Sequence, residues 1–337
     1  MPTPAAPLIE CVINVSEGRD LGVLDRMSEA IDSVDNCYLL HRDIGHGAHR
    51  TVFTFAGAPE GVYEAAFHLY RIADEHLDMR RHRGTHPRSG AIDVCPLVPI
   101  ANIQEAEVRA GTQELAKMVA ERFNLPVYLY ENSAALPHRA NLAAVRKGEF
   151  EGLTEKMQLP DWQPDFGPST PHPRLGITIM GTRPFLIAWN INLSAEATPE
   201  QANQLAARLR GSGAAGRPGL FPGLKAIGWY IEEYGRCQVS CNVVDPDQVS
   251  LARVYLTATD LAAAMGIKVT GSELIGLIPA RHLRAAARNF SFSSDYEEEM
   301  DTAVSILGLA DLEPFNWRQR VLEEVYRFAA QTDRRNQ

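Results

Sequence analysis

Residues 185–193 have the sequence FLIAWNINL, in which side chains of two kinds alternate. Successive side chains of a β-strand point to opposite faces of the sheet. One face of this stretch is therefore apolar from Phe185 to Leu193, whereas the other ends in Asn190 and Asn192. The pattern predicts a strand with one buried face and one polar face.

The same alternation occurs in IECVINVS, residues 9–16, and in QVSCNVV, residues 238–244. Apart from Glu10, the polar faces of these strands hold carboxamides and hydroxyls, such as Asn14 and Asn242, rather than flexible charges. Short, stiff donors and acceptors suit a cavity that orients a ligand, although a solvated sheet face is the alternative. We therefore interpret the three strands as parts of two sheets that face each other across a polar ligand cavity.

Strand patterns alternate with helical periodicity along the whole chain. A proline-rich break at residues 152–176 separates halves of similar plan. The sequence thus predicts an α+β fold of two subdomains, residues 1–181 and 182–330. The predicted strands are 8–15, 37–43, 51–56, 91–98, 126–130, 176–180, 185–193, 225–231, 238–244 and 267–270, and the predicted helices are 21–31, 59–77, 103–123, 199–209, 247–264 and 282–287.

Composition excludes several classes of protein. The 337 residues are 45% hydrophobic and 22% charged, as in ordinary globular proteins, with a net charge of −9 that argues against a nucleic-acid partner. No apolar run is long enough to span a membrane. Residues 1–7 lack the pattern of a secretory signal, so we expect a cytoplasmic protein with its five cysteines reduced.

The densest group of reactive side chains is MRRHRGTHPRSGAIDVCP, residues 79–96. His82 and His86 are four residues apart, but the zinc-protease motif needs a glutamate after the first histidine and a continuous helix, which Pro87 disfavours. His86 remains as an imidazole in a stiff loop beside Arg88, whose charge favours the neutral, basic form. A surface histidine without catalytic function is the alternative.

A second group lies in LLHRDIGHGAHRTVFTF, residues 39–55. Four of its side chains are of the types that bind metal ions. A metal-dependent amidohydrolase is therefore one alternative. Equally, Asp43 could orient or stabilise a catalytic imidazole. The four residues are His41, Asp43, His46 and His49.

Taken together, the segments of the chain resemble the glutamate formimidoyltransferase family, which transfers a formimino group to tetrahydrofolate in histidine degradation. The matching segments occur in order along nearly the whole chain. They are IECVINVSEGRD, RTVFTFAG, HRGTHPRSGAIDVCPLVPI, LPVYLYE, WQPDFGPSTPHPRLGIT, PFLIAWNINL, IGWYIEEYGRCQVSCNVVD and GSELIGLIPARHL.

The resemblance implies a homodimer of chains that each have two ferredoxin-like subdomains, with mixed sheets facing each other across a folate tunnel and helices outside. It places the catalytic histidine at His86 and its acidic partner at Asp43. The proline-rich break contains the implied folate-binding loop, which consists of Gly167, Pro168, Ser169, Thr170, Pro171, His172, Pro173, Arg174, Leu175 and Gly176.

The implied reaction transfers the formimino group of N-formimino-L-glutamate to N5 of tetrahydrofolate, giving 5-formimino-tetrahydrofolate and glutamate. Neutral His86 is the expected general base, and Asp43 stabilises charge. We expect no metal, because a protonated amidine is already electrophilic. Guanidinium groups match carboxylates, so Arg50 and Arg88 are candidates for the glutamyl carboxylates. Candidates for contacts to pterin or formimino nitrogens are Asn14, Asn190, Asn192 and Asn242.

The chain departs from the family pattern at several positions. Ile13 and Val15 replace a proline and a phenylalanine in the first segment, and His49 stands where the family tends to have asparagine. His172 and Arg174 differ within the folate loop. A different formimino or formyl donor on the same scaffold, or a folate-binding protein without catalysis, therefore stays an alternative.

Overall fold

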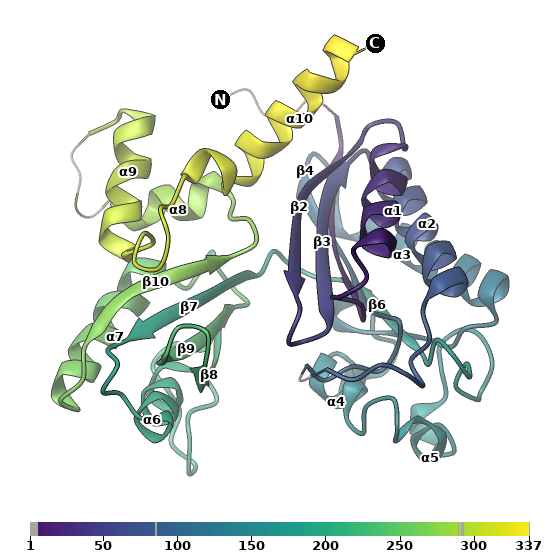
Figure 1. Ribbon diagram of the computed structural model, residues 1–337, viewed down its shortest axis with the longest axis horizontal. Coiled ribbons are helices and arrows are strands. Elements are labelled where there is room, and N and C mark those ends of the chain that lie inside the picture. The colour runs from purple at the N-terminus through teal and green to yellow at the C-terminus, as the bar shows by residue number, and fades with distance from the viewer. Residues whose placement is uncertain (1–5, 85, 289, 291–292, 337) are drawn as a thin grey trace. The chain divides into compact units, whose positions relative to one another are not determined.

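The structure is a computed structural model that describes residues 6–84, 86–288, 290 and 293–336. Residues 1–5, which contribute to the expectation about a secretory signal, lie outside this description. The chain divides into two compact units (Figure 1). Unit 1 is Met1–Arg183 with Ala329–Gln337, and unit 2 is Pro184–Phe328. Within the described chain, no helix is both long and apolar enough to cross a membrane.

Unit 1 is built on a mixed sheet with the strand order β2-β3-β1-β4-β6-β5. The central strand β1 is antiparallel to β3 and β4, whereas β6 is parallel to β4 and β5. The strands are β1 (Leu8–Val15), β2 (Cys37–Gly45), β3 (Arg50–Gly57), β4 (Ile92–Ala101), β5 (Val127–Leu129) and β6 (Thr178–Thr182).

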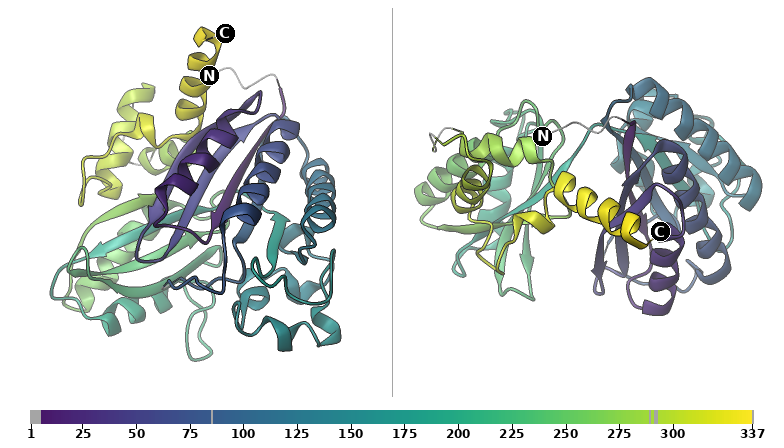
Figure 2. Two further views of the ribbon diagram at one scale, coloured as in Figure 1. Left: turned by 45° about the vertical axis from the view of Figure 1, so that its right-hand side comes forward. Right: turned by 90° about the horizontal axis from the view of Figure 1, so that it is seen from above.

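Three long helices of unit 1 cover one face of this sheet (Figures 1 and 2). The covered face of β1 is apolar, and Ile9, Cys11, Ile13 and Val15 have no exposed surface. Burial of such side chains is the main stabilising contribution to the unit. The helices of unit 1 are α1 (Leu21–Asp32), α2 (Pro59–His76), α3 (Glu105–Phe123), α4 (Leu142–Arg146), α5 (Leu153–Lys156) and the 3₁₀ helices η1 (Glu131–Ser133), η2 (Pro137–Arg139) and η3 (Pro160–Trp162).

Unit 2 has an antiparallel sheet with the strand order β10-β7-β9-β8. Its first helix, α6, begins at a capping box formed by Thr198 and Gln201. The strands are β7 (Ile187–Leu193), β8 (Leu224–Ile231), β9 (Arg236–Val243) and β10 (Val269–Ile275), and the helices are α6 (Pro199–Leu209), α7 (Leu251–Ala264), α8 (Ala280–Ala287), α9 (Tyr296–Leu307), η4 (Trp317–Gln319) and α10 (Leu322–Asn336), which continues past the end of the unit.

The two units repeat one topology, β-α-β-β-α-β with corresponding strand orders. In unit 1 these elements are β1 to β4 with α1 and α2, and in unit 2 they are β7 to β10 with α6 and α7. The connection before the last strand differs, because it spans residues 77–91 in unit 1 and only 265–268 in unit 2. Two sheets with helices confirm the predicted α+β class.

Candidate active site

His86 lies in the long connection between α2 and β4 of unit 1, and its imidazole is half-buried. The carbonyl oxygen of Pro87 is 2.7 Å from its Nδ1. Nη1 of Arg50, at the start of β3, lies 2.9 Å from Nε2 and 2.6 Å from Nδ1. Because a carbonyl only accepts and a guanidinium only donates, we assign the ring proton to Nδ1 and the lone pair to Nε2.

The surroundings of His86 keep its ring uncharged. Burial, followed by the positive charge of Arg50, lowers the pKa of His86 to about 3. The charge of Arg146 acts in the same direction, and the hydrogen bond to Pro87 opposes the shift. The imidazole is therefore neutral at pH 7, which is the form that can accept a proton.

A buried carboxylate lies beside Arg50. Asp93, on β4, is 1% exposed, and its Oδ1 accepts a hydrogen bond from the backbone N–H of Ser89 at 2.8 Å. Its Oδ2 lies 2.8 Å from Nη2 of Arg146, the last residue of α4, and 3.6 Å from Nη1 of Arg50. Asp93 thus links two guanidinium groups from different elements next to His86.

Neither Asp93 nor Arg146 was among the candidates from the sequence. The sequence does contain a feature that points to Asp93. A carboxylate within the apolar run of residues 91–98 must be paired if the strand is buried. Arg146 belongs to none of the motifs, and only the fold brings α4 to β4.

Asp43, the expected acidic partner, lies on β2 opposite Val52 of β3. Its side chain is exposed, and within the described residues it makes neither a hydrogen bond nor an ion pair. The carboxylate that contacts the arginine beside His86 is that of Asp93. A role of Asp43 toward a bound substrate stays a prediction.

Two other histidines of these motifs, His49 and His82, hold loops together. The rings of His49 and His82 stack with centroids 4.2 Å apart, and Nε2 of His82 is 2.7 Å from the carbonyl oxygen of His49. Nδ1 of His49 contacts the carbonyl oxygen of Arg83 at 2.9 Å, and its Nε2 contacts Oε1 of Glu17 at 3.1 Å. Both ring nitrogens of His49 therefore have partners within the protein.

His49 also has a left-handed backbone conformation, with φ of 53°. Among residues other than glycine, asparagine, aspartate and histidine tolerate this conformation best.

In the described part of the chain, no group of three or more histidine, cysteine or acidic side chains could hold a metal ion. The amidohydrolase alternative, which needs His41, Asp43, His46 and His49 together, is therefore not supported.

Arg88 is 8% exposed, and carboxylates of the protein surround its guanidinium. Its Nη1 and Nη2 bind the two oxygens of Glu151 at 2.7 and 2.6 Å, and Nη1 also binds Glu149 at 3.0 Å. These bonds, chiefly the one to Glu151, raise the pKa of Arg88. Of the two arginines predicted to bind substrate carboxylates, Arg50 contacts His86 and Arg88 binds acids of the chain.

The predicted folate-binding loop, residues 167–176, is attached to both ends of the connection that carries His86. The N–H of Met79 donates to the carbonyl oxygen of Arg174 at 2.8 Å, and the N–H of Ala91 donates to that of Leu175 at 2.9 Å. The loop and the candidate base thus belong to one hydrogen-bonded part of unit 1.

Close packing fixes the end of this loop. Gly176 has φ of 72°, and a Cβ at this position would lie 2.3 Å from the carbonyl oxygen of Ser89.

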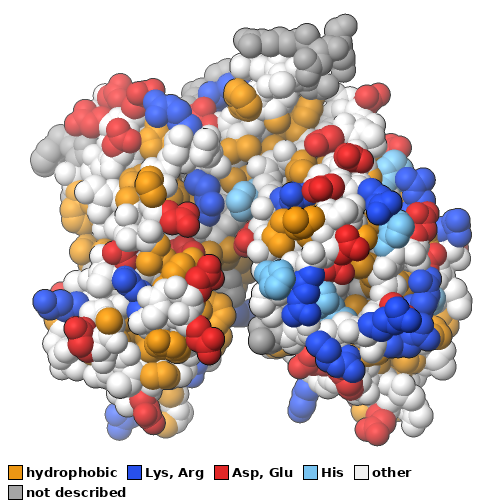
Figure 3. All heavy atoms as spheres, in the orientation of Figure 1, with side chains coloured by type: hydrophobic (Ala, Val, Ile, Leu, Met, Phe, Trp, Pro, Cys, Tyr) orange, Lys and Arg blue, Asp and Glu red, His pale blue; other side chains and the backbone are white. Residues whose placement is uncertain are grey.

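A pocket of about 510 Å³ is lined by residues of this loop and by residues near the start of the connection. On the face drawn in Figure 3, side chains of lysine, arginine and histidine lie at several places over unit 1. The pocket is lined by Met79, Arg80, Arg83, Phe150, Glu151, Thr154, Pro171, His172 and Pro173.

Two of the candidate asparagines belong to a buried polar network in unit 2. Asn192 has no exposed surface; its Oδ1 accepts from Gln238 at 2.8 Å, and its Nδ2 donates to Asp311 at 3.0 Å. Asn190 is 5% exposed and donates to Glu273 at 3.1 Å. Both ends of the Asn192 amide are therefore used within the unit.

The other two asparagines have different surroundings. Asn242 is exposed on β9 of unit 2. Asn14, on β1 of unit 1, donates to the carbonyl oxygen of Val12 at 2.8 Å and is 9% exposed. Asn242 is thus the candidate whose amide is most open to solvent.

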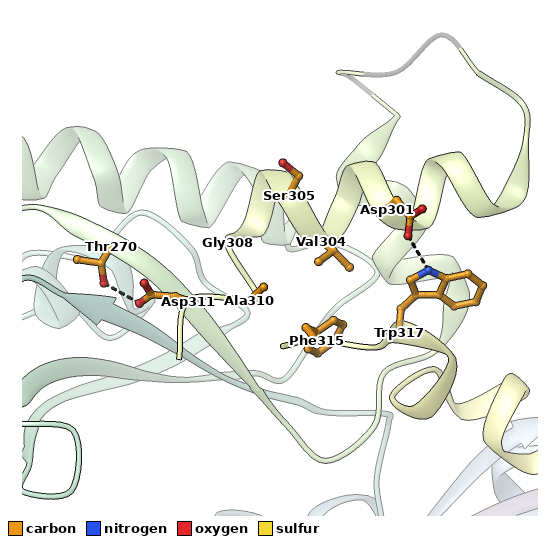
Figure 4. Close-up of a pocket in the computed structure, with 9 residues that line it drawn as sticks. All are labelled: Thr270, Asp301, Val304, Ser305, Gly308, Ala310, Asp311, Phe315 and Trp317. Atoms are coloured by element: carbon orange, nitrogen blue, oxygen red, sulfur yellow. Dashed lines mark hydrogen bonds between the residues drawn. The ribbon is translucent and has the colours of Figure 1, made fainter. Parts of the chain in front are cut away.

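Unit 2 also contains a pocket of about 430 Å³ beside α9 (Figure 4). Thr270 donates to Asp311 at 2.8 Å, and Nε1 of Trp317 donates to Asp301 at 2.9 Å, so both carboxylates have partners. No candidate from the sequence lies there. The pocket is lined by Thr270, Asp301, Val304, Ser305, Gly308, Ala310, Asp311, Phe315 and Trp317.

Comparisons with known proteins cover both units. Residues 8–183 match the family model of the N-terminal subdomain of the formiminotransferase domain. Residues 188–327 match the model described as the formiminotransferase domain.

Curated relatives have corresponding names. A formimidoyltransferase-cyclodeaminase of Rattus norvegicus is 42% identical over 322 residues, which are 94% of this chain and 59% of that protein. The chain thus spans about three fifths of that relative. A glutamate formimidoyltransferase of Streptococcus pyogenes serotype M1 is 40% identical over 87% of this chain and 96% of that enzyme. One from Thermoplasma acidophilum is 34% identical over 86% of this chain and 94% of that enzyme.

Proposed function

The chain belongs to the formiminotransferase family, and we propose that it transfers the formimino group of N-formimino-L-glutamate to N5 of tetrahydrofolate. The observation that carries this proposal is the neutral, half-buried imidazole of His86 next to the cation of Arg50. An uncharged base beside a cation suits a reaction in which an amine loses a proton and an anionic amino acid leaves.

His86 moves one proton twice in the proposed reaction. Its Nε2 takes the proton from N5 as N5 bonds to the formimino carbon. The imidazolium then gives this proton to the nitrogen of the departing glutamate as the carbon–nitrogen bond breaks. Such positioned proton transfer typically accelerates a reaction by about 10²- to 10⁴-fold.

Arg50 must release Nε2 before it can accept a proton, because its Nη1 lies 2.9 Å from that atom. A carboxylate of the donor is a stronger partner for a guanidinium than a neutral imidazole. We propose that the bound donor draws Arg50 from the ring. Its negative charge also reduces the cost of the imidazolium, which the free site disfavours.

Most of the other predicted residues keep their proposed roles in this reaction. Asp43 stabilises the imidazolium or the tetrahedral adduct, the loop at 167–176 contacts folate, and Asn14, Asn190 and Asn242 contact pterin or formimino nitrogens. The amide of Asn192 is bound at both ends within unit 2, which leaves it no group for a substrate. The attachment of that loop to both ends of the His86 connection supports its role. Arg88, predicted to bind a glutamyl carboxylate, has its guanidinium bound by Glu149 and Glu151 and stays an untested candidate.

We further propose the boundary between residues 181 and 182 and a ferredoxin-like fold for each subdomain. The shared β-α-β-β-α-β order supports the ferredoxin-like fold, and the compact units divide at Arg183 and Pro184, two residues after the proposed boundary. A folate tunnel lined by both sheets, a homodimer and a cytoplasmic location rest on the resemblance and stay predictions.

The test is formation of 5-formimino-tetrahydrofolate from N-formimino-L-glutamate and tetrahydrofolate by the purified chain. His86→Ala should lower kcat by at least about 100-fold. His76→Ala, which changes a partly exposed histidine at the end of α2, is the matched control and should keep wild-type activity. Activity of His86→Ala within about threefold of wild type would remove His86 from proton transfer.

The alternative of a different donor is decided in the same assay. Formiminoglycine and formyl donors replace formiminoglutamate while tetrahydrofolate is held constant. A higher kcat/KM with one of them would change the assigned substrate and leave His86 as the base. Folate binding by calorimetry without turnover of any donor would indicate a binding protein instead.

A further inference from the structure

Arg146 carries hydrogen-bond donors that the protein leaves unused at a buried position. Its side chain is 15% exposed, and Nη2 lies 2.8 Å from Oδ2 of Asp93. Neither Nε nor Nη2, both enclosed, has the geometry of a hydrogen bond to any acceptor in the described chain. Nη2 is thus held against Asp93 by charge, Nε has no acceptor, and the exposed part of the guanidinium is where a ligand can bind.

Arg146 shares its one paired carboxylate with a second cation. Arg50 and Arg146 are both cations, and both lie against the single carboxylate of Asp93. His86 adds no negative charge, and the nearby acids Glu149 and Glu151 bind Arg88. Arg50 and Arg146 thus have one directly paired carboxylate between them in a partly desolvated site, which leaves room for an anionic ligand at this pair of cations.

We propose that Arg146 binds the side-chain carboxylate of the amino-acid donor and so selects an acidic amino acid. This inference rests on the proposed function. The α-carboxylate of the donor is attached to the carbon that carries the formimino nitrogen, so it must lie next to His86, where Arg50 is. The second carboxylate is further along the side chain, and Arg146 is the second cation on the same Asp93.

Asp93 sets the distance between the two cations. Because its Oδ2 contacts Arg50 and Arg146 and its Oδ1 is held by the Ser89 N–H, neither guanidinium can move far without losing an ion pair. A donor with two carboxylates can bind both cations together. A donor with a neutral side chain binds one and leaves the donors of Arg146 unpaired.

The test compares N-formimino-L-glutamate with N-formimino-L-glutamine, which has the same length but an uncharged amide. In Arg146→Gln, kcat/KM for the glutamate compound should fall by at least about tenfold, while the value for the glutamine compound changes by less than about threefold. KM for tetrahydrofolate should not change. Arg122→Gln, an exposed arginine of α3, is the control and should keep the wild-type ratio.

Each outcome supports or overturns the inference. If kcat/KM of Arg146→Gln falls equally with both donors, or if its preference for the glutamate compound is unchanged, the inference is overturned. Transfer activity of the wild-type protein would still support the proposed function in that case. A wild-type protein that is inactive with every formimino donor contradicts the proposed function itself. If Arg146→Gln does not fold, Arg146→Lys replaces it; lysine lacks the planar fork, so the preference should fall several-fold, and an unchanged ratio overturns the inference.

Discussion

Burial is the largest cause of the low pKa of His86 and the charge of Arg50 is the second, and Arg50→Gln tests this second contribution directly. Two unit charges about 4 Å apart interact by about 4 kcal/mol at an effective dielectric constant of about 20, which corresponds to about 3 pKa units. Solvent at the half-buried ring reduces this effect. We therefore expect the variant to raise the pKa of His86 from about 3 by about 1 to 3 units, with burial keeping it below its ordinary value.

The measurement is an NMR titration of the histidine ring protons, with the His86 signal identified by its loss in His86→Gln. The wild-type signal should not titrate between pH 5 and pH 8, whereas the Arg50→Gln signal should begin to shift below about pH 6. The pH profile of kcat/KM should gain an acid limb at the same pH. A wild-type pKa between 6 and 7, or no change in the variant, would refute the electrostatic account of this site.

Three further outcomes follow from other contacts. Burial, aided by the charge of Arg281, lowers the pKa of His282 to about 4. Between about pH 6.5 and pH 4 the unfolded chain therefore binds a proton that the folded protein does not, so the free energy of unfolding should fall by up to about 1.4 kcal/mol per pH unit for this group. Urea unfolding measures this fall, which should be smaller in His282→Gln. Gly176→Ala should lower the unfolding free energy by about 1 to 3 kcal/mol, because it combines positive φ with a clash against Ser89; an unchanged melting temperature would contradict this. Burial raises the pKa of Cys11 and Cys241, so neither thiol should react with a thiol reagent at pH 8 until the protein unfolds, and rapid labelling of either in the native protein would count against their burial.

Local patterns were sufficient for most strands and helices. The predicted strand at 8–15 matches β1, and the predicted helix at 199–209 matches α6, because alternation and a capped, amphipathic start are properties of short segments. The helices expected from the sequence do not include α9, although Asp295 caps it and three glutamates fill its first turn. They also do not include α10, because a strongly polar helix has little of the apolar periodicity on which the prediction depends.

The site was less accessible to sequence reasoning, because its parts come from separate elements. His86 and Arg50 stood in motifs, but the link through Asp93 and Arg146 depends on the position of a five-residue helix next to β4. The alternation of side chains correctly predicted that one face of β7 carries Asn190 and Asn192. Its partners Glu273 and Asp311 come from distant positions, so alternation alone did not reveal that the amides already have acceptors.

The connection that carries His86 occupies residues 77–91, whereas its counterpart in unit 2 is residues 265–268. The proposed base thus lies in a connection that is longer than its counterpart, on a framework that occurs twice. The groups around it do not belong to this connection, because Arg50 is on β3, Asp93 on β4 and Arg146 on α4. Transfer of the loop alone to another protein would therefore move the imidazole without the charges that help to keep it neutral.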